Sequence, residues 1–158
     1  MLSKYEFEDK YSGMVKEFHN GKKYRSFFTF DGLNNFCWVP VPKEVAFGGG
    51  FRQAIEDEGF VIRRQILFEI QSSSHLSVIM PREMKKLSRK KLEDAEMKWS
   101  RQGGKVRYQI TGATTYVKNG MYFAALQAEC PDIYVIREEL GLEGCPEDFE
   151  VHATLGER

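Results

Sequence analysis

The sequence has few cysteines and no arrangement of them that builds a structural site. Its three cysteines, Cys37, Cys130 and Cys145, are scattered over 158 residues without a Cys-x-x-Cys spacing. Such an odd set indicates neither a disulfide framework nor a zinc ribbon, and it favours a reducing, cytoplasmic setting. No stretch approaches the roughly 20 apolar residues that a membrane-spanning helix needs, and the charged N-terminus is unlike a signal peptide.

The sequence also lacks net charge, because 23 Lys and Arg balance 23 Asp and Glu. Proteins that coat DNA or bind anionic membranes usually carry a basic surface, so membrane binding and extended DNA binding are both disfavoured. A nucleic-acid partner would then be a small nucleotide or a locally held RNA end. The basic run KKLSRKK at 85–91 has acidic neighbours, and we interpret it as a solvated helix face that could alternatively attract an RNA end.

The residues that are present suit a folded chain of mixed secondary structure. Hydrophobic residues make up 42% of the chain, which is enough to form a core. Aromatic and alternating runs predict strands at 24–30, 36–41, 60–70, 106–117, 121–129 and 149–156, with the prolines of 36–41 suiting a sheet edge. Helices are predicted before Asn20-Gly21 and at 51–58, 81–102 and 131–142. Asn119-Gly120 predicts a hairpin.

Two of the three histidines occur in the same short pattern. HLSVI at 75–79 and HATLG at 152–156 each place a hydroxyl residue two positions after the histidine. Because side chains alternate across a strand, His75 shares a face with Ser77, and His152 shares a face with Thr154. The two motifs lie about half a chain apart, which favours an internal duplication with one histidine strand in each lobe.

This set of side chains suits phosphodiester cleavage. One imidazole would accept a proton from water or a ribose hydroxyl, while the other would donate a proton to the leaving oxygen. Ser77 and Thr154 would donate to the nonbridging oxygens, where charge develops. The scheme requires no metal or other cofactor, and the spacing does not support a zinc site built from the three histidines. The plainer interpretation, a structural histidine, applies best to His19.

Other residues are weaker candidates for substrate binding. By strand parity Arg107 shares a face with Gln109 and could lie beside the groove as an anion clamp. One of Tyr108, Tyr116 and Tyr122 is expected to stack on a base, and Tyr108 is the one that we assign to substrate binding.

Three glycines at 48–50 precede a predicted helix. They could approach a phosphate, with Arg52 beside it, because helix N-termini attract anions. They lack the Lys-Ser/Thr of a P-loop, so a flexible connection is the favoured interpretation.

The two histidine motifs resemble the twin His-x-Ser/Thr-x-hydrophobic signatures of the two-histidine (2H) phosphoesterases. That superfamily includes RNA 2′,3′-cyclic phosphodiesterases and phage enzymes that degrade cyclic oligonucleotide immune signals. The element order from residue 106 onward is also similar to the second lobe of the family, whereas the chain before His75 matches poorly. The resemblance implies an α+β fold in which two lobes of mostly antiparallel sheet form a concave groove with helices outside. It also implies His75 and His152 as the catalytic pair, with Ser77 and Thr154 binding phosphate.

Together these patterns predict a metal-independent phosphodiesterase built as a single two-lobed domain over residues 1–158. The expected substrate is a nucleotide phosphodiester, with a cyclic one favoured: a 2′,3′-cyclic phosphate at an RNA end, or a cyclic di- or oligonucleotide signal, as in phage anti-defence enzymes. The sequence leaves open which histidine is the base. Two alternatives also remain, a noncatalytic nucleotide sensor or sponge that uses the same groove and a structural interaction protein.

Overall fold

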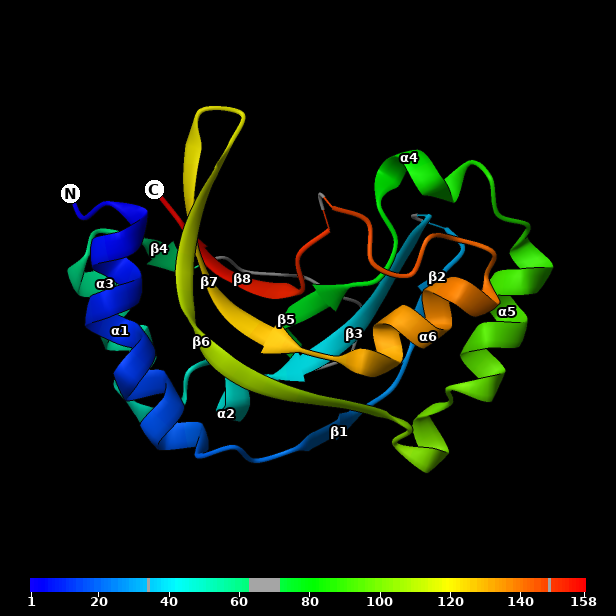
Figure 1. Ribbon diagram of the computed structural model, residues 1–158, viewed down its shortest axis with the longest axis horizontal. Helices are drawn as coiled ribbons and strands as arrows, with labels where there is room; N and C mark the ends of the chain where they lie inside the picture. The colour runs from blue at the N-terminus through cyan, green and yellow to red at the C-terminus, as the bar shows by residue number, and fades with distance from the viewer. Residues whose placement is uncertain (34, 63–71, 148) are drawn as a thin grey trace.

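The chain folds into one curved sheet with helices around it (Figure 1). The computed structural model describes residues 1–33, 35–62, 72–147 and 149–158. Up to residue 62 the elements are α1 (Lys4–His19), β1 (Tyr24–Ser26), β2 (Thr29–Asp31), β3 (Phe36–Pro42), α2 (Lys43–Ala46), a 3-10 turn (Gly48–Gly50), α3 (Phe51–Asp57) and β4 (Val61–Ile62). They are followed by β5 (Ser72–Ser77), α4 (Pro81–Met84), α5 (Arg89–Lys98), a second 3-10 turn (Arg101–Gly103), β6 (Val106–Lys118), β7 (Met121–Glu129), α6 (Pro131–Glu139) and β8 (His152–Glu157).

The sheet brings the two histidine motifs together. Its strand order is β1-β6-β7-β8-β5-β3-β2, and β4 pairs with β8 beside this path. Every strand pairing in the described ranges is antiparallel, which confirms the predicted α+β class with mostly antiparallel sheet. The motif strands β5 and β8 are direct neighbours, with Leu76 opposite Ala153. The halves β1-β6-β7-β8 and β5-β3-β2 therefore meet between the two motifs.

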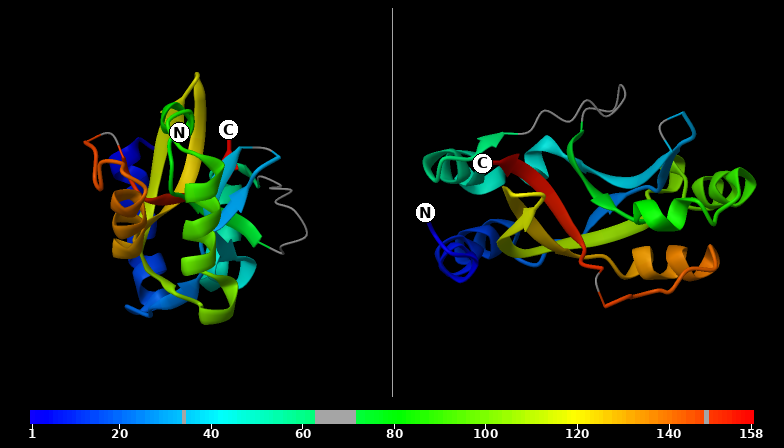
Figure 2. Two further views of the ribbon diagram at one scale, coloured as in Figure 1. Left: turned by 90° about the vertical axis from the view of Figure 1, so that its right-hand side faces the viewer. Right: turned by 90° about the horizontal axis from the view of Figure 1, so that it is seen from above.

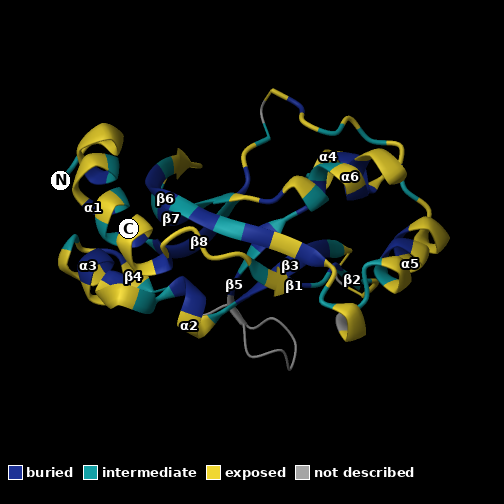
Figure 3. Cartoon of the chain, turned by 60° about the horizontal axis from the view of Figure 1, so that its bottom comes forward, coloured by how far each residue is buried: buried dark blue, intermediate teal, exposed yellow. Residues whose placement is uncertain are grey.

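Helix α1 shows how the sequence produces this packing. Phe7, Tyr11 and Val15 recur every four residues, so they share one face of the helix, and all three are buried. The helix packs along β6, and α6 packs farther along the same strand. Ser3 accepts a hydrogen bond from the Glu6 backbone at the N-terminus. Asn20 ends the helix where the sequence predicts, and its backbone is in the left-handed conformation. Helix faces that point away from the sheet are exposed (Figure 3).

The β6–β7 hairpin forms as predicted. Asn119 and Gly120 both have positive φ, 52° and 75°, which is the backbone of the tight turn that best matches the twist of a hairpin. The hairpin projects at the end of the molecule where both chain termini lie (Figures 1 and 2). It forms one wall of the site described below.

Three predicted elements differ from the structure. The strand at 24–30 is two strands, because β1 pairs with β6 whereas β2 pairs with β3. Strand β3 is internal and not an edge, yet its prolines are tolerated because β2 covers only Phe36–Trp38 and leaves Pro40 beyond its end. The helix at 81–102 is two helices, since Ser88 accepts from the Lys91 backbone and starts α5. Of the strand at 60–70, residues 63–70 lie outside the described residues.

The three glycines at 48–50 are shaped by packing. A Cβ on Gly48 would lie 2.0 Å from a ring carbon of Phe18, and a Cβ on Gly49 would also clash with that ring. The side chain of Arg52 pairs with Glu56 on the same helix. The glycines therefore allow α1 to lie close to the start of α3.

Within the described ranges, no helix has the length and apolarity that crossing a membrane requires.

Candidate functional site

A cavity of about 760 Å³ lies over the junction of β5 and β8. This volume is within the range of sites that hold nucleotide-sized ligands. Its walls come from the start of α1, from β3, α4 and β6, and from the loop before β8. All four motif residues line it: His75, Ser77, His152 and Thr154.

The register of β5 and β8 fixes how these four side chains are arranged. Leu76 and Ala153 are opposite each other and fully buried, so they face the core. Continuing this antiparallel register by one residue in each direction places His75 opposite Thr154 and Ser77 opposite His152. Directly opposed residues have Cβ atoms about 5 Å apart, and diagonal ones about 7–8 Å. The two imidazoles thus occupy one diagonal of a compact square, and the two hydroxyls occupy the other.

His152 is held in a defined orientation. Its Nδ1 lies 2.9 Å from the Glu150 backbone carbonyl oxygen. A carbonyl oxygen can only accept a hydrogen bond, so Nδ1 carries the hydrogen and Nε2 is the nitrogen left for chemistry. The ring of Tyr116 packs edge-on against the imidazole, with centroids 4.9 Å apart.

Thr154 is held from two sides. Its hydroxyl oxygen lies 2.5 Å from the Tyr116 hydroxyl, and its backbone carbonyl accepts a 2.8 Å hydrogen bond from the buried Ser74 hydroxyl. The bond to Ser74 joins β8 to β5 next to both motifs. The one to Tyr116 joins the motif to the β6 wall.

His75 lies against an aromatic wall. The Phe36 ring contacts it edge-on, with centroids 5.1 Å apart and planes at 88°. Phe36 in turn stacks on the buried Trp38. Because β3 pairs with β5, Pro40 lies opposite His75 in the sheet.

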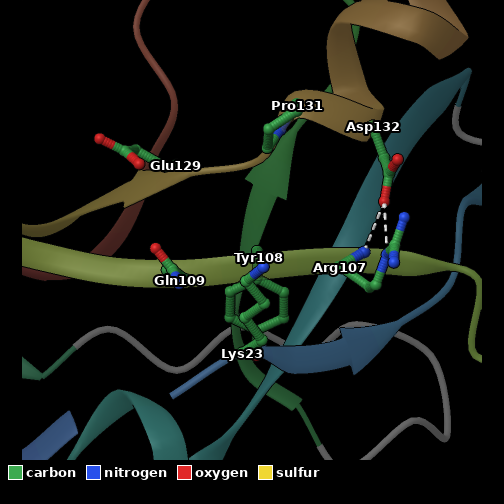
Figure 4. Close-up of a pocket in the computed structure, with 7 residues that line it drawn as sticks. All are labelled: Lys23, Arg107, Tyr108, Gln109, Glu129, Pro131 and Asp132. Atoms are coloured by element: carbon green, nitrogen blue, oxygen red, sulfur yellow. Dashed lines mark hydrogen bonds and ion pairs between the residues drawn. The ribbon is translucent and has the colours of Figure 1, made fainter. Parts of the chain in front are cut away.

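Arg107 lies at a different site. It lines a separate cavity of about 370 Å³ together with Gln109, as parity on β6 predicts (Figure 4). Its backbone N–H donates to the Asp132 carboxylate over 2.8 Å, and its guanidinium lies 3.8 Å from the same oxygen. Arg107 therefore fastens β6 to the start of α6 and is not among the residues that line the cavity of the histidine motifs.

Tyr108 is also absent from the lining of the histidine cavity. Val106, Tyr108 and Ile110 alternate with exposed or half-buried neighbours, so Tyr108 faces the core and is only 2% exposed. Its ring stacks on Tyr24, and its hydroxyl has no hydrogen-bond partner within the described structure. Burial raises the pKa of this phenol well above its ordinary value. Of the three tyrosines considered from the sequence, Tyr116 is the one that reaches the histidine cavity.

His19 is buried at the end of α1. Its Nδ1 lies 2.5 Å from the Tyr24 hydroxyl, its ring packs against Phe18, and burial lowers its pKa. It does not line the cavity with His75 and His152. Across the part of the chain that the structure describes, no group of three His, Cys, Asp or Glu side chains is close enough to hold a metal ion.

A buried ion pair supports the walls of the cavity. Arg137, which is fully buried, donates to both carboxylate oxygens of Glu83 over 2.9 and 2.6 Å. It also donates to the carbonyl of Val78, within the first motif, and its guanidinium lies over the ring of Phe149, just before the second. Burial by itself would raise the pKa of Glu83, but hydrogen bonds from Arg137 and from the Met80 backbone outweigh it and lower that pKa. This pair therefore connects the end of the first motif with the segment just before the second.

Several lining residues were not singled out from the sequence. Parity with Tyr116 could have indicated Lys118, and the position two residues before His152 could have indicated Glu150. Others, among them Lys4, Phe36 and Phe149, come from segments that only the fold brings to the cavity.

Comparison with known proteins identifies the family. Residues 53–158 match the family model described as 2H-SAK, Swiss Army Knife, 2H phosphoesterase domain. No curated protein and no solved structure matches the chain. The matched region contains both histidine motifs, the strands that carry them and the β6–β7 wall of the cavity. The chain therefore belongs to the 2H phosphoesterase family.

Proposed function

We propose that this protein is a metal-independent phosphodiesterase that cleaves a nucleotide phosphodiester, with a cyclic one favoured. The observation that carries this proposal is the cross-strand square, in which two imidazoles and two hydroxyls share one cavity. Membership of the 2H phosphoesterase family supports a phosphoesterase in general. To this general activity the proposal adds a cyclic nucleotide substrate and catalysis without a metal.

The square supplies each group that in-line displacement needs. A phosphate centred over it can accept hydrogen bonds from Ser77 and Thr154, which lie on one diagonal, as negative charge builds on its nonbridging oxygens. The two imidazoles on the other diagonal flank the phosphorus, so one can take a proton from the attacking hydroxyl or water while the other protonates the leaving oxygen. His152 would act through Nε2, because its Nδ1 is bonded to the Glu150 carbonyl.

The cavity walls suit a nucleoside next to that phosphate. Phe36 beside His75 and Tyr116 beside His152 are both half-buried, so part of each ring reaches the cavity. Bases stack on such rings without a strong preference for sequence. A volume of about 760 Å³ leaves room for sugar and base beyond the reacting phosphate.

The test is single substitution of each histidine. His75→Ala and His152→Ala are each expected to lower kcat by about 10²–10⁴-fold, since each removes a general acid or base. The substrates are 2′,3′-cyclic mononucleotides, cyclic dinucleotides, cyclic trinucleotides and RNA with a cyclic-phosphate end, each with and without a chelator. Circular dichroism and thermal unfolding of both variants control for loss of structure.

The outcomes separate the competing functions. Turnover of one class that survives the chelator supports the proposal and identifies the substrate. Full activity in both alanine variants contradicts the catalytic assignment. Tight binding of a nucleotide by the unmodified protein, with no product after long incubation, would instead support a sensor or sponge.

A further inference from the structure

Two lysines line the same cavity as the histidine motifs. They are Lys4, at the start of α1, and Lys118, at the end of β6. No other lysine and no arginine is among the lining residues that the structure describes. Lys118 is exposed and forms no ion pair with any described residue, while Lys4 has only an exposed contact of 4.0 Å with Glu8. Both ammonium groups are therefore available to an anion in the cavity.

The fold places these lysines beside the catalytic square. Lys118 is two residues from Tyr116 on β6, so it lies on the same face about 7 Å farther along the strand. The Tyr116 hydroxyl already reaches Thr154. The start of α1, which carries Lys4, lies at the same end of the molecule as the tip of the β6–β7 hairpin (Figures 1 and 2). The cationic end of the cavity is thus adjacent to the place of the reacting phosphate.

The charge of the cavity is unevenly distributed. Glu150, the acidic residue among those that line it, precedes β8 next to His152. Lys118 belongs to the other end, because it pairs with Met121 at the hairpin tip, beyond the point where Phe123 pairs with Glu157 at the far end of β8. The start of α1, which carries Lys4, lies at that end as well (Figure 1). In a partly enclosed cavity, two ammonium groups attract an anion more strongly than they would in bulk water. Since the chain has no net charge, this attraction is a local feature.

We infer that Lys4 and Lys118 form a second anion subsite, which binds another phosphate of the same substrate. This inference rests on the proposed function, which places the scissile phosphate over the histidine square. It narrows the substrate class to nucleotides that carry at least two phosphates. A cyclic dinucleotide and an RNA end with a 2′,3′-cyclic phosphate both supply that second phosphate, whereas a 2′,3′-cyclic mononucleotide does not.

Equilibrium binding tests the subsite independently of turnover. Full-length protein with His152→Ala, which should keep the probes intact, is titrated with three probes by calorimetry. The probes are a 2′,3′-cyclic mononucleotide, a dinucleotide ending in a 2′,3′-cyclic phosphate and a cyclic dinucleotide. Adding Lys118→Met or Lys4→Met should raise the Kd of the preferred two-phosphate probe about tenfold more than that of the mononucleotide. Lys118→Arg should largely retain the preference.

The matched control is Lys90→Met on α5, which removes an exposed lysine that does not line the cavity. It should leave the ratio of the Kd values unchanged. The subsite is overturned if the lysine variants weaken all probes equally, or if the parent shows no preference for two phosphates. Turnover by unmodified protein is measured in parallel on the three probes and on a cyclic trinucleotide. Its absence for all four contradicts the proposed function, while the Kd comparison still decides the subsite.

Discussion

At the scale of single residues, Tyr116 connects the two groups that the second motif contributes. Its hydroxyl contacts Thr154 and its ring contacts His152. A threonine hydroxyl has one hydrogen, so Thr154 can donate to a phosphate oxygen only if it accepts from Tyr116. Tyr116 therefore acts as a positioning residue, which aims the hydrogen of Thr154 at the substrate.

Removing this hydroxyl should lower kcat/KM. Tyr116→Phe keeps the ring beside His152 and is expected to cost about 1 kcal/mol, or roughly fivefold in kcat/KM. The decisive measurement is a double-mutant cycle with Thr154→Val. If Tyr116 works through Thr154, the second substitution should abolish most of the effect of the first. Full additivity of the two losses would show that Tyr116 acts by another route.

At the scale of elements, the Arg137–Glu83 pair joins α6 to α4 and to the ends of both motifs. Both partners are buried, with side chains 0% and 10% exposed. A buried pair is costly to break, because the remaining partner keeps its charge without water. The positions of α4 and of the segment before β8, which form walls of the cavity, therefore depend on this buried ion pair.

Breaking the pair should destabilise the fold strongly. Glu83→Gln is expected to lower the free energy of unfolding by about 3 kcal/mol at pH 7, measured by urea denaturation. Glu93→Gln, which removes an exposed partner of Arg89, is the matched control and should cost less than about 0.5 kcal/mol. Similar losses in the two variants would refute the role of burial.

The same pair predicts an acid dependence. Because the pKa of Glu83 is lowered on folding, its contribution to stability is present above the ordinary glutamate pKa of about 4.3 and is lost as pH falls through the lower folded value. The stability of the unmodified protein should thus decline more steeply below that pH than the stability of Glu83→Gln. Urea denaturation at several pH values between neutral and acid compares the two slopes. Parallel curves would exclude this linkage.

At the scale of the whole molecule, the cysteines report on the integrity of the core. Cys37 and Cys130 are fully buried, and burial raises the pKa of each thiol to about 12, whereas Cys145 is exposed. Only the thiolate reacts quickly with thiol reagents. Cys145 is therefore accessible to a reagent in the folded protein, whereas Cys37 and Cys130 become accessible only on unfolding.

A thiol assay should distinguish the cysteines. One thiol per chain is expected to react rapidly in the folded protein, and all three in denaturant. Peptide mapping should assign the fast site to Cys145, and Cys145→Ser should remove it. Rapid reaction of Cys37 or Cys130 in the folded state would contradict the packing of the core.

The sequence by itself determined what depends on local order. Alternation fixed which motif residues share a face, Asn119-Gly120 fixed the hairpin, and the repeated His-x-Ser/Thr pattern indicated the family, which the match over residues 53–158 confirms. Only the tertiary structure decided which strands are neighbours. The register of Leu76 with Ala153 creates the square. The pairing of β6 with β7 and of β7 with β8 places Tyr116 and Lys118 beside it and leaves Arg107 and Tyr108 at another part of the fold. These choices arise from contacts between residues distant in the chain, whose energies depend on the packing of the whole core and not on local pattern.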